Sequence, residues 1–254
     1  MARTAVALLT IALGGASACS KHAAGSMHVV ALLDVSASIV PDSLSLGAKA
    51  IEDLTGKLKR GDRISIVPIE GDSETEAQGK LLRFNVPIER QAYDQDLEVL
   101  KGSVHESLQK LRQSTLLHPG TRTDILGSLG LAQQEFMDDG PSVRRVLIVL
   151  SDFIEDDDAF NFRSNQALAN TARARSLAAL LSRDVDLRFA HTLVYLGMLR
   201  SRDSARLSPS RRQAIREFWT DYFAGFDTKP VITTDGPGLL DGFVTSARNP
   251  LAGK

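Results

Sequence analysis

The chain of 254 residues has one cysteine, few aromatic residues and no excess of charge of either sign. A lone cysteine cannot form a disulfide within the chain. Lysine and arginine number 30 against 31 aspartates and glutamates, and aromatic residues make up 6% without alternating with basic runs. Nucleic-acid binding needs a basic face, often with interleaved aromatic side chains. The composition therefore argues against a nucleic-acid partner.

Several catalytic signatures are also missing. The five histidines have no spacing typical of a zinc site, and no glycine-rich phosphate loop is present. Ser151 lacks the flanking glycines of a nucleophile elbow. After the N-terminal segment, the longest apolar run (143–150) is too short to cross a membrane and contains two arginines. These absences favour a binding protein over an enzyme.

The N-terminal residues have the layout of a secretory signal peptide. A positively charged start precedes the apolar run 5–13, and the small residues 16–18 follow it. Cys19 comes next, as in a bacterial lipobox, where the cysteine becomes the lipidated first residue; residues 16–18 also fit ordinary signal-peptidase cleavage. We expect residues 1–18 to be a signal peptide and 19–26 a flexible tether. The protein is then exported, either periplasmic or anchored to the bacterial envelope through lipid on Cys19.

Strand and helix patterns alternate along the rest of the chain. The predicted strands are 28–33, 63–69, 81–86, 143–150 and 187–195, and the predicted helices are 41–59, 97–111, 125–137, 167–181 and 213–223, with a last helical turn after Gly238. The nearly continuous apolar runs 28–33 and 143–150 are typical of strands buried on both faces. Pro68 favours the end or the edge of its strand, because proline cannot donate to a ladder.

Alternation of this kind predicts one α/β domain with a doubly wound, mostly parallel sheet and helices on both faces. A hairpin after residue 69 would add one antiparallel edge strand. The domain is expected to span residues 27–246, followed by a C-terminal tail at 247–254.

Three segments with oxygen-bearing side chains stand at the expected strand ends or before a helix. They contain Asp34, Ser36 and Ser38 after the first strand, Thr123 before the helix at 125, and Asp152 after the strand 143–150. Because ligands bind beyond the carboxyl ends of the strands in such sheets, these side chains are expected to converge. Carboxylates and hydroxyls are hard oxygen ligands that suit Mg²⁺ or Ca²⁺.

Local roles are the alternative for each segment. Asp34 and Ser36 could cap the following helix, and Thr123 or Asp124 could cap the next one. Asp152 could be an ordinary turn residue. Thr121 competes with Thr123 as the hydroxyl ligand.

The ordered set of motifs resembles the von Willebrand factor A family. The segment Asp34-Val-Ser-Ala-Ser38, then Thr123-Asp-Ile with Leu129 six residues on, then a strand ending in Ser151-Asp152 looks like the family's metal-ion-dependent adhesion site. The resemblance implies a Rossmann-like fold and a Mg²⁺ (or Mn²⁺ or Ca²⁺) site made by Asp34, Ser36, Ser38, Thr123 and Asp152. The sequence departs from the family at Ala37 and Phe153, where the family usually has glycine.

The resemblance also implies that the ion grips an acidic side chain of another protein. The sequence thus predicts a non-catalytic adhesion or scaffold module of the bacterial envelope, with a membrane contact only through its N-terminal lipid. A metal-assisted hydrolase using the same site, and an assembly scaffold with a vestigial site, are the alternatives. Asp34 and Thr123 are expected to lie outside the core, and the acidic run 155–158 is expected to be a solvated loop.

Overall fold

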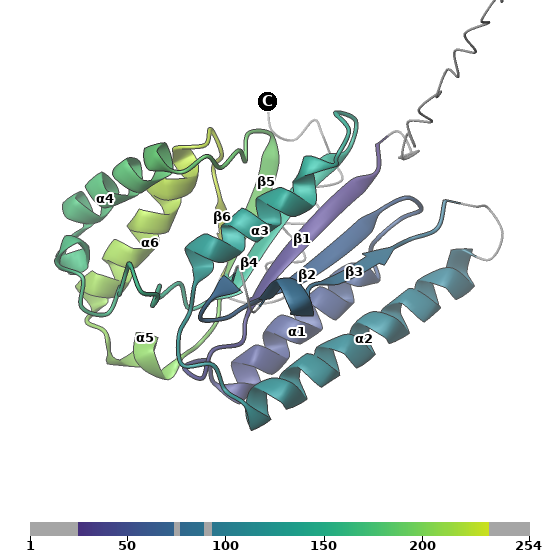
Figure 1. Ribbon diagram of the computed structural model, residues 1–254, viewed down its shortest axis with the longest axis horizontal. Helices are drawn as coiled ribbons and strands as arrows, with labels where there is room; N and C mark the ends of the chain where they lie inside the picture. Colours follow the sequence, from purple (N-terminus) through teal and green to yellow (C-terminus); the bar gives the residue numbers. More distant parts are fainter. Residues whose placement is uncertain (1–24, 74–76, 89–92, 234–254) are drawn as a thin grey trace, which may run out of the picture.

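The computed structural model describes residues 25–73, 77–88 and 93–233 of the chain. They form a single sheet with helices on both faces (Figure 1). The elements in chain order are β1 (Met27–Asp34), α1 (Pro41–Thr55), β2 (Arg63–Ile69), η2 (Gln78–Lys80), β3 (Leu82–Asn85), α2 (Tyr93–Leu117), α3 (Ile125–Met137), β4 (Arg144–Ser151), η3 (Gln166–Ala169), α4 (Thr171–Asp184), β5 (Thr192–Met198), α5 (Arg202–Arg206), α6 (Pro209–Ala224) and β6 (Val231–Thr233).

The six strands have the order β3-β2-β1-β4-β5-β6. β1 pairs in parallel with β2 and β4, β5 pairs in parallel with β4 and β6, and β3 runs antiparallel at the edge beside β2. The ladder with β3 ends at Ile66, two residues before Pro68. The predicted fold class is confirmed. The winding reverses between β1 and β4, and doubly wound sheets bind ligands at such a switch point, beyond the carboxyl ends of the strands.

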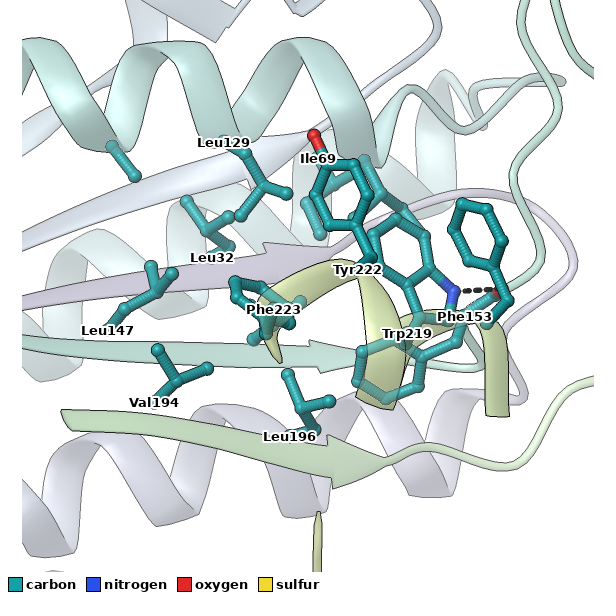
Figure 2. Close-up of a cluster of buried hydrophobic side chains, with 14 of the residues drawn as sticks. Leu32, Ile69, Leu129, Leu147, Phe153, Val194, Leu196, Trp219, Tyr222 and Phe223 are labelled. Carbon is teal, nitrogen blue, oxygen red and sulfur yellow. Dashed lines mark hydrogen bonds between the residues drawn. The ribbon is translucent and has the colours of Figure 1, made fainter. Parts of the chain in front are cut away.

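Both faces of β1 are buried, because successive side chains of a strand point to opposite sides of the sheet. Val30 and Leu32 pack in the core that includes the α6 aromatic residues, and Figure 2 shows Leu32 in the same cluster as Trp219. Val29 and Leu33 pack on the other side, in the core that contains residues of α1 and α2. With both faces covered by helices, the strand ends and their loops are left to form a binding site.

The strand predicted at 187–195 is displaced. β5 begins at Thr192, because His191 takes a left-handed backbone conformation with φ of 63° and interrupts an extended chain. The helix predicted from residue 167 begins at Thr171 after a short 3₁₀ turn, where the Asn170 side chain accepts a hydrogen bond from the N–H of Arg173 at 2.9 Å.

The helix predicted at 213–223 begins earlier, at Pro209, because Ser208 caps it and proline suits the first helical position. The short elements α5 and β6 were not predicted. The helical turn expected after Gly238 and the domain end at 246 lie outside the described residues. Among the helices that are described, none has the length and apolar character needed to span a bilayer.

Candidate functional site

The carboxylate of Asp34 ties the ends of the two central strands together. Its Oδ1 accepts the N–H of Ser36 at 2.9 Å, and its Oδ2 accepts the hydroxyl of Ser151 at 2.6 Å. Asp34 is fully buried, so the expectation that it lies outside the core was wrong. Burial raises the pKa of its carboxyl, and the hydrogen bonds from Ser151 and Ser36 oppose this rise.

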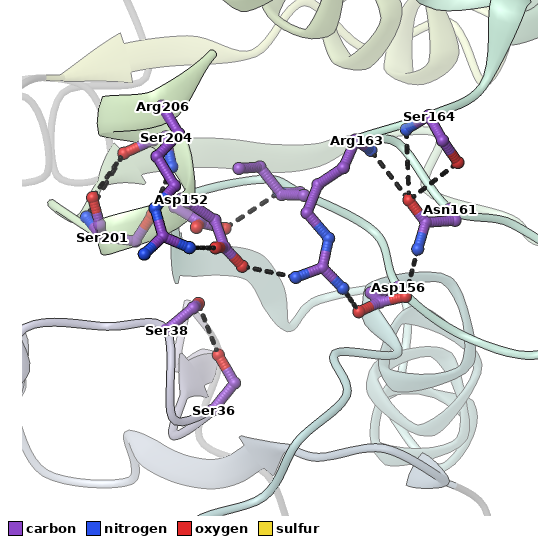
Figure 3. A network of polar contacts seen from close by, with 12 residues as sticks. Ser36, Ser38, Asp152, Asp156, Asn161, Arg163, Ser164, Ser201, Ser204 and Arg206 are labelled. Atoms are coloured by element: carbon purple, nitrogen blue, oxygen red, sulfur yellow. Dashed lines mark hydrogen bonds and ion pairs between the residues drawn. The ribbon is translucent and has the colours of Figure 1, made fainter.

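The two serines of the first loop stand beside each other at the carboxyl end of β1. Their hydroxyl oxygens are 3.1 Å apart, and Figure 3 shows both in the same polar region as Asp152. Helix α1 takes Val40 as its N-cap, without a side-chain hydrogen bond. The capping alternative for Asp34 and Ser36 therefore fails, and the serine hydroxyls are available for another role.

A backbone contact brings the second loop against the first, since the N–H of Ala37 donates to the carbonyl of Gly120 at 2.8 Å. Thr123 is 5% exposed and so was also wrongly expected outside the core, whereas Thr121 is exposed. Asp124, not Thr123, caps α3, accepting the N–H of Gly127 at 2.6 Å. The burial of Thr123 and the exposure of Thr121 favour Thr123 as the candidate ligand, and its backbone pairs with Asp156 of the loop after β4.

Asp152 carries the third group, and one of its oxygens accepts no hydrogen bond from the part of the chain that the structure describes. Its Oδ1 accepts the N–H of Ile154 at 2.9 Å, whereas its Oδ2 is buried without a hydrogen bond from any described residue. Burial, together with the charge of Asp34, raises the pKa of Asp152 to about 7; the hydroxyl of Ser201 and the N–H of Ile154 hold it down in part. The charge of Asp34 disfavours ionisation of Asp152, and either a proton or a bound cation would offset this repulsion.

Phe153 explains one departure from the family pattern. It has φ of 63°, a left-handed conformation that glycine adopts without strain and that costs other residues about 1–2 kcal/mol. Its ring packs against the indole of Trp219 with centroids 6.0 Å apart, and its carbonyl accepts the indole N–H at 2.9 Å (Figure 2). Burial of the ring offsets the backbone strain, so the turn after Asp152 keeps its shape without glycine.

The structure also adds a fourth loop that the sequence motifs did not indicate. The N–H of Arg202 donates to the carbonyl of Ser38 at 2.9 Å, which places the start of α5 beside the first loop. Ser201 is buried and caps α5, and its hydroxyl lowers the pKa of Asp152. The signal in the sequence is only a Ser-x-x-Ser capping pair, which says nothing about a distant site.

A cleft of about 540 Å³ adjoins the second loop. Its lining residues are Gly71, Asp72, Pro119, Gly120, Thr121, Arg122, Asp124, Asp157, Asp158 and Ala159. Carboxylate oxygens of two of these lining residues, Asp124 and Asp157, and of Glu155 lie within 4.8 Å of one another. Glu155 is fully buried, contrary to the solvated loop expected for the run 155–158, because it accepts the N–H groups of Ile125 and Leu126 at the start of α3. Two of these three carboxylates are thus engaged by the first turn of that helix.

The loops after β1 and β4 and the loop before α3 lie at the switch-point end of the sheet, and the five residues predicted from the sequence carry two carboxylates and three hydroxyls. All five side chains offer oxygen, the donor type that Mg²⁺, Mn²⁺ and Ca²⁺ prefer, and they include no thiolate or imidazole. The Oδ2 of Asp152, which accepts no hydrogen bond from a described residue, and the adjacent hydroxyls of Ser36 and Ser38 fit one hard divalent cation.

No family model matches the chain, and no curated protein matches its sequence. Among solved structures, it is similar to an aerotolerance-related membrane protein from Bacteroides fragilis with multiple mutations to serines, at 14% identity and a TM-score of 0.47, over 88% of this chain and 99% of that one. BatB, a conserved hypothetical protein from Bacteroides thetaiotaomicron, gives 15% identity and a TM-score of 0.48, over 88% of this chain and 100% of that one.

A von Willebrand factor type A structure from Catenulispora acidiphila is 16% identical with a TM-score of 0.46, over 88% of this chain and 42% of that one. Likenesses of this degree leave the chemistry of the site to be interpreted from this chain's own residues.

Proposed function

We propose that this chain is a von Willebrand factor A-like module of the bacterial envelope that binds one divalent cation and uses it to capture an acidic group of a partner protein. The observation that carries the proposal is the pair of buried carboxylates of Asp34 and Asp152. One oxygen of Asp152 has no hydrogen bond from a described residue, and the pKa of each carboxyl is raised by burial. A bound cation would pair with that oxygen of Asp152 and would offset the cost of burying the two negative charges.

Asp34, Ser36, Ser38, Thr123 and Asp152 would hold the ion, with Mg²⁺ the expected occupant and Mn²⁺ or Ca²⁺ able to replace it. When bound, the ion supplies a Lewis-acidic point for an incoming carboxylate. The hydroxyl ligands are neutral, so they leave positive charge on the ion for that carboxylate. Both aspartates act only as ligands of the ion in this proposal, and neither is needed as a general base. A hydrolase would need a general base in addition to these ligands, and we therefore propose a binding role without catalysis.

Replacement of Thr123 by alanine tests the proposal at a neutral ligand. We expect Thr123→Ala to weaken the binding of a tetraglutamate peptide to the Mn²⁺-loaded domain by about tenfold or more, since the lost hydroxyl is a ligand of the ion and a lost polar interaction with a charged group costs ~1.5–3 kcal/mol. Peptide binding by calorimetry, in excess Mn²⁺ and in EDTA, gives the measurement.

Thr121→Ala is the matched control, because it removes the same hydroxyl from an exposed position two residues away. It should change peptide binding less than about twofold. If Thr121→Ala is the damaging change, the wrong threonine has been assigned. If the peptide binds equally well in EDTA, the ion takes no part in binding. The scaffold alternative would then replace the proposed function.

We also propose that Cys19, which lies outside the described residues, carries a lipid that anchors the mature protein. The support is its place between a signal-like segment and a polar tether. Cys19→Ser should abolish labelling by a palmitate analogue and move the protein from the membrane fraction to the periplasm. If labelling and fractionation are unchanged, the protein is simply secreted to the periplasm.

A further inference from the structure

The mouth of the proposed ion site carries an arginine between two carboxylates. Arg163 donates from Nη1 to Oδ2 of Asp203 at 2.7 Å and pairs through Nη2 with Asp156 (Figure 3). The arginine side chain is 38% exposed, while Asp203 and Asp156 are 17% and 16% exposed. All three groups therefore stand at the border between the buried site and solvent.

Asp156, in the loop after β4, and Asp203, in α5, each belong to a segment near the proposed ligands. Asp156 exchanges two backbone hydrogen bonds with Thr123, at 3.1 and 2.8 Å. Asp203 lies near enough to Asp152 for its charge to raise the pKa of that carboxyl. Arg163 thus joins the loop after β4 to α5 across the rim of the site.

Most of the charge compensation at the rim comes from this one side chain. With Arg163 removed, Asp156 would lose this ion pair and Asp203 would keep only the exposed Arg206 at 3.9 Å, so their negative charge would add to that of the buried Asp34 and Asp152. The four carboxylates together attract a cation more strongly and repel an approaching acidic side chain. The capture of an acidic partner therefore needs these two outer charges to be neutralised.

We propose that Arg163 is the selectivity residue of the rim. Its guanidinium neutralises Asp156 and Asp203, limits the attraction of the site for the cation and makes the loaded site receptive to an acidic side chain. The inference rests on the proposed function and deepens it. Arg163 acts on the ligand by its charge and on the ion only through its two aspartate partners.

The test compares Arg163→Gln with Arg206→Gln in the full domain, using Mn²⁺ alone and then tetraglutamate with Mn²⁺ in excess. Arg206 is a matched control, since it also faces Asp203, but at 3.9 Å and with 79% of its side chain exposed. We expect Arg163→Gln to raise the Mn²⁺ affinity about threefold to tenfold and to lower the tetraglutamate affinity by a similar factor. Arg206→Gln should change each affinity less than about twofold.

Opposite changes of the two affinities separate a charge effect from a structural one. If both affinities fall together in Arg163→Gln and in Arg163→Lys, the arginine only braces the two loops and the inference is overturned. If neither changes, Arg163 has no role. A wild-type domain that binds no Mn²⁺ overturns the proposed function and this inference with it, whereas normal wild-type binding with unchanged variants overturns the inference alone.

Discussion

Asp34→Asn is expected to lose most ion binding while the domain keeps its fold. The variant keeps the shape of the side chain and an oxygen to accept the N–H of Ser36, but it removes the charge. We expect the affinity for Mn²⁺ to fall more than about a hundredfold, because one of two charged ligands is lost. In the metal-free domain the variant removes the cost of burying a charge, but it also replaces the oxygen that accepts the Ser151 hydroxyl with an amide group, so its stability should stay within about 1–2 kcal/mol of wild type.

Calorimetry with Mn²⁺ and urea unfolding in EDTA measure the two effects. Asp42→Asn is the control, since Asp42 is an exposed carboxylate in the first turn of α1, a few residues from the site. It should leave ion binding within about twofold and cost a few tenths of a kcal/mol through the helix dipole. An Asp34→Asn variant that still binds Mn²⁺ with nearly wild-type affinity would remove Asp34 from the ligand set.

Trp219→Ala is expected to cause the largest loss of stability, about 3–5 kcal/mol, the cost of truncating a buried large aromatic residue. The indole is 1% exposed, packs against Phe153, Phe162 and Phe218, and donates its N–H to the carbonyl of Phe153. A loss of this size is a large part of the total stability of a domain, ~5–15 kcal/mol. Trp219 is the only tryptophan of the chain, so the variant has no tryptophan fluorescence. Its urea unfolding should therefore be followed by circular dichroism.

Trp219→Phe separates packing from the hydrogen bond. It keeps an aromatic ring but leaves the Phe153 carbonyl without its donor, so a loss of about 1–3 kcal/mol is expected. The turn that carries Asp152 should then loosen, and ion affinity should fall with stability. Unchanged stability of Trp219→Ala would mean that α6 does not hold this turn.

The central strands could be predicted because their residues are apolar nearly without interruption, as a strand buried on both faces requires. Asp34, Ser36 and Asp152 stand directly after those strands, so the topology alone predicts their convergence. The start of β5 could not be predicted, since residues 187–191 have the composition of a strand. A left-handed His191 interrupts them, and sequence periodicity does not reveal the sign of φ.

The contacts at the rim of the site could not be predicted from short sequence patterns, for a different reason. The contact of Arg163 with Asp203 joins residues 40 positions apart and depends on how two loops pack. Glu155 shows the same limit, because an acidic run predicts exposure unless a helix N-terminus happens to receive one of its carboxylates. Both cases require tertiary contacts that a motif of a few residues does not encode.

The pH dependence of the site follows from Asp152. Its pKa is about 7 in the folded chain against 3.8 as the ordinary value, so between these values the folded state holds more protons than the unfolded state. This contribution to the stability of the metal-free domain is therefore greatest at low pH and is lost as the pH rises through about 7, by ~1.4 kcal/mol per unit. Metal binding has the opposite dependence, because the ion must displace the proton.

Calorimetric titration of the wild-type domain with Mn²⁺ at pH 8 and at pH 6 measures binding of the proposed ion itself. We expect one ion per chain, a dissociation constant of about 10⁻⁴–10⁻³ M at pH 8, and binding weaker by up to about tenfold at pH 6, where Asp152 is mostly protonated. A well-folded sample that gives no binding heat at either pH, up to roughly 10 mM Mn²⁺, would contradict the proposed ion site.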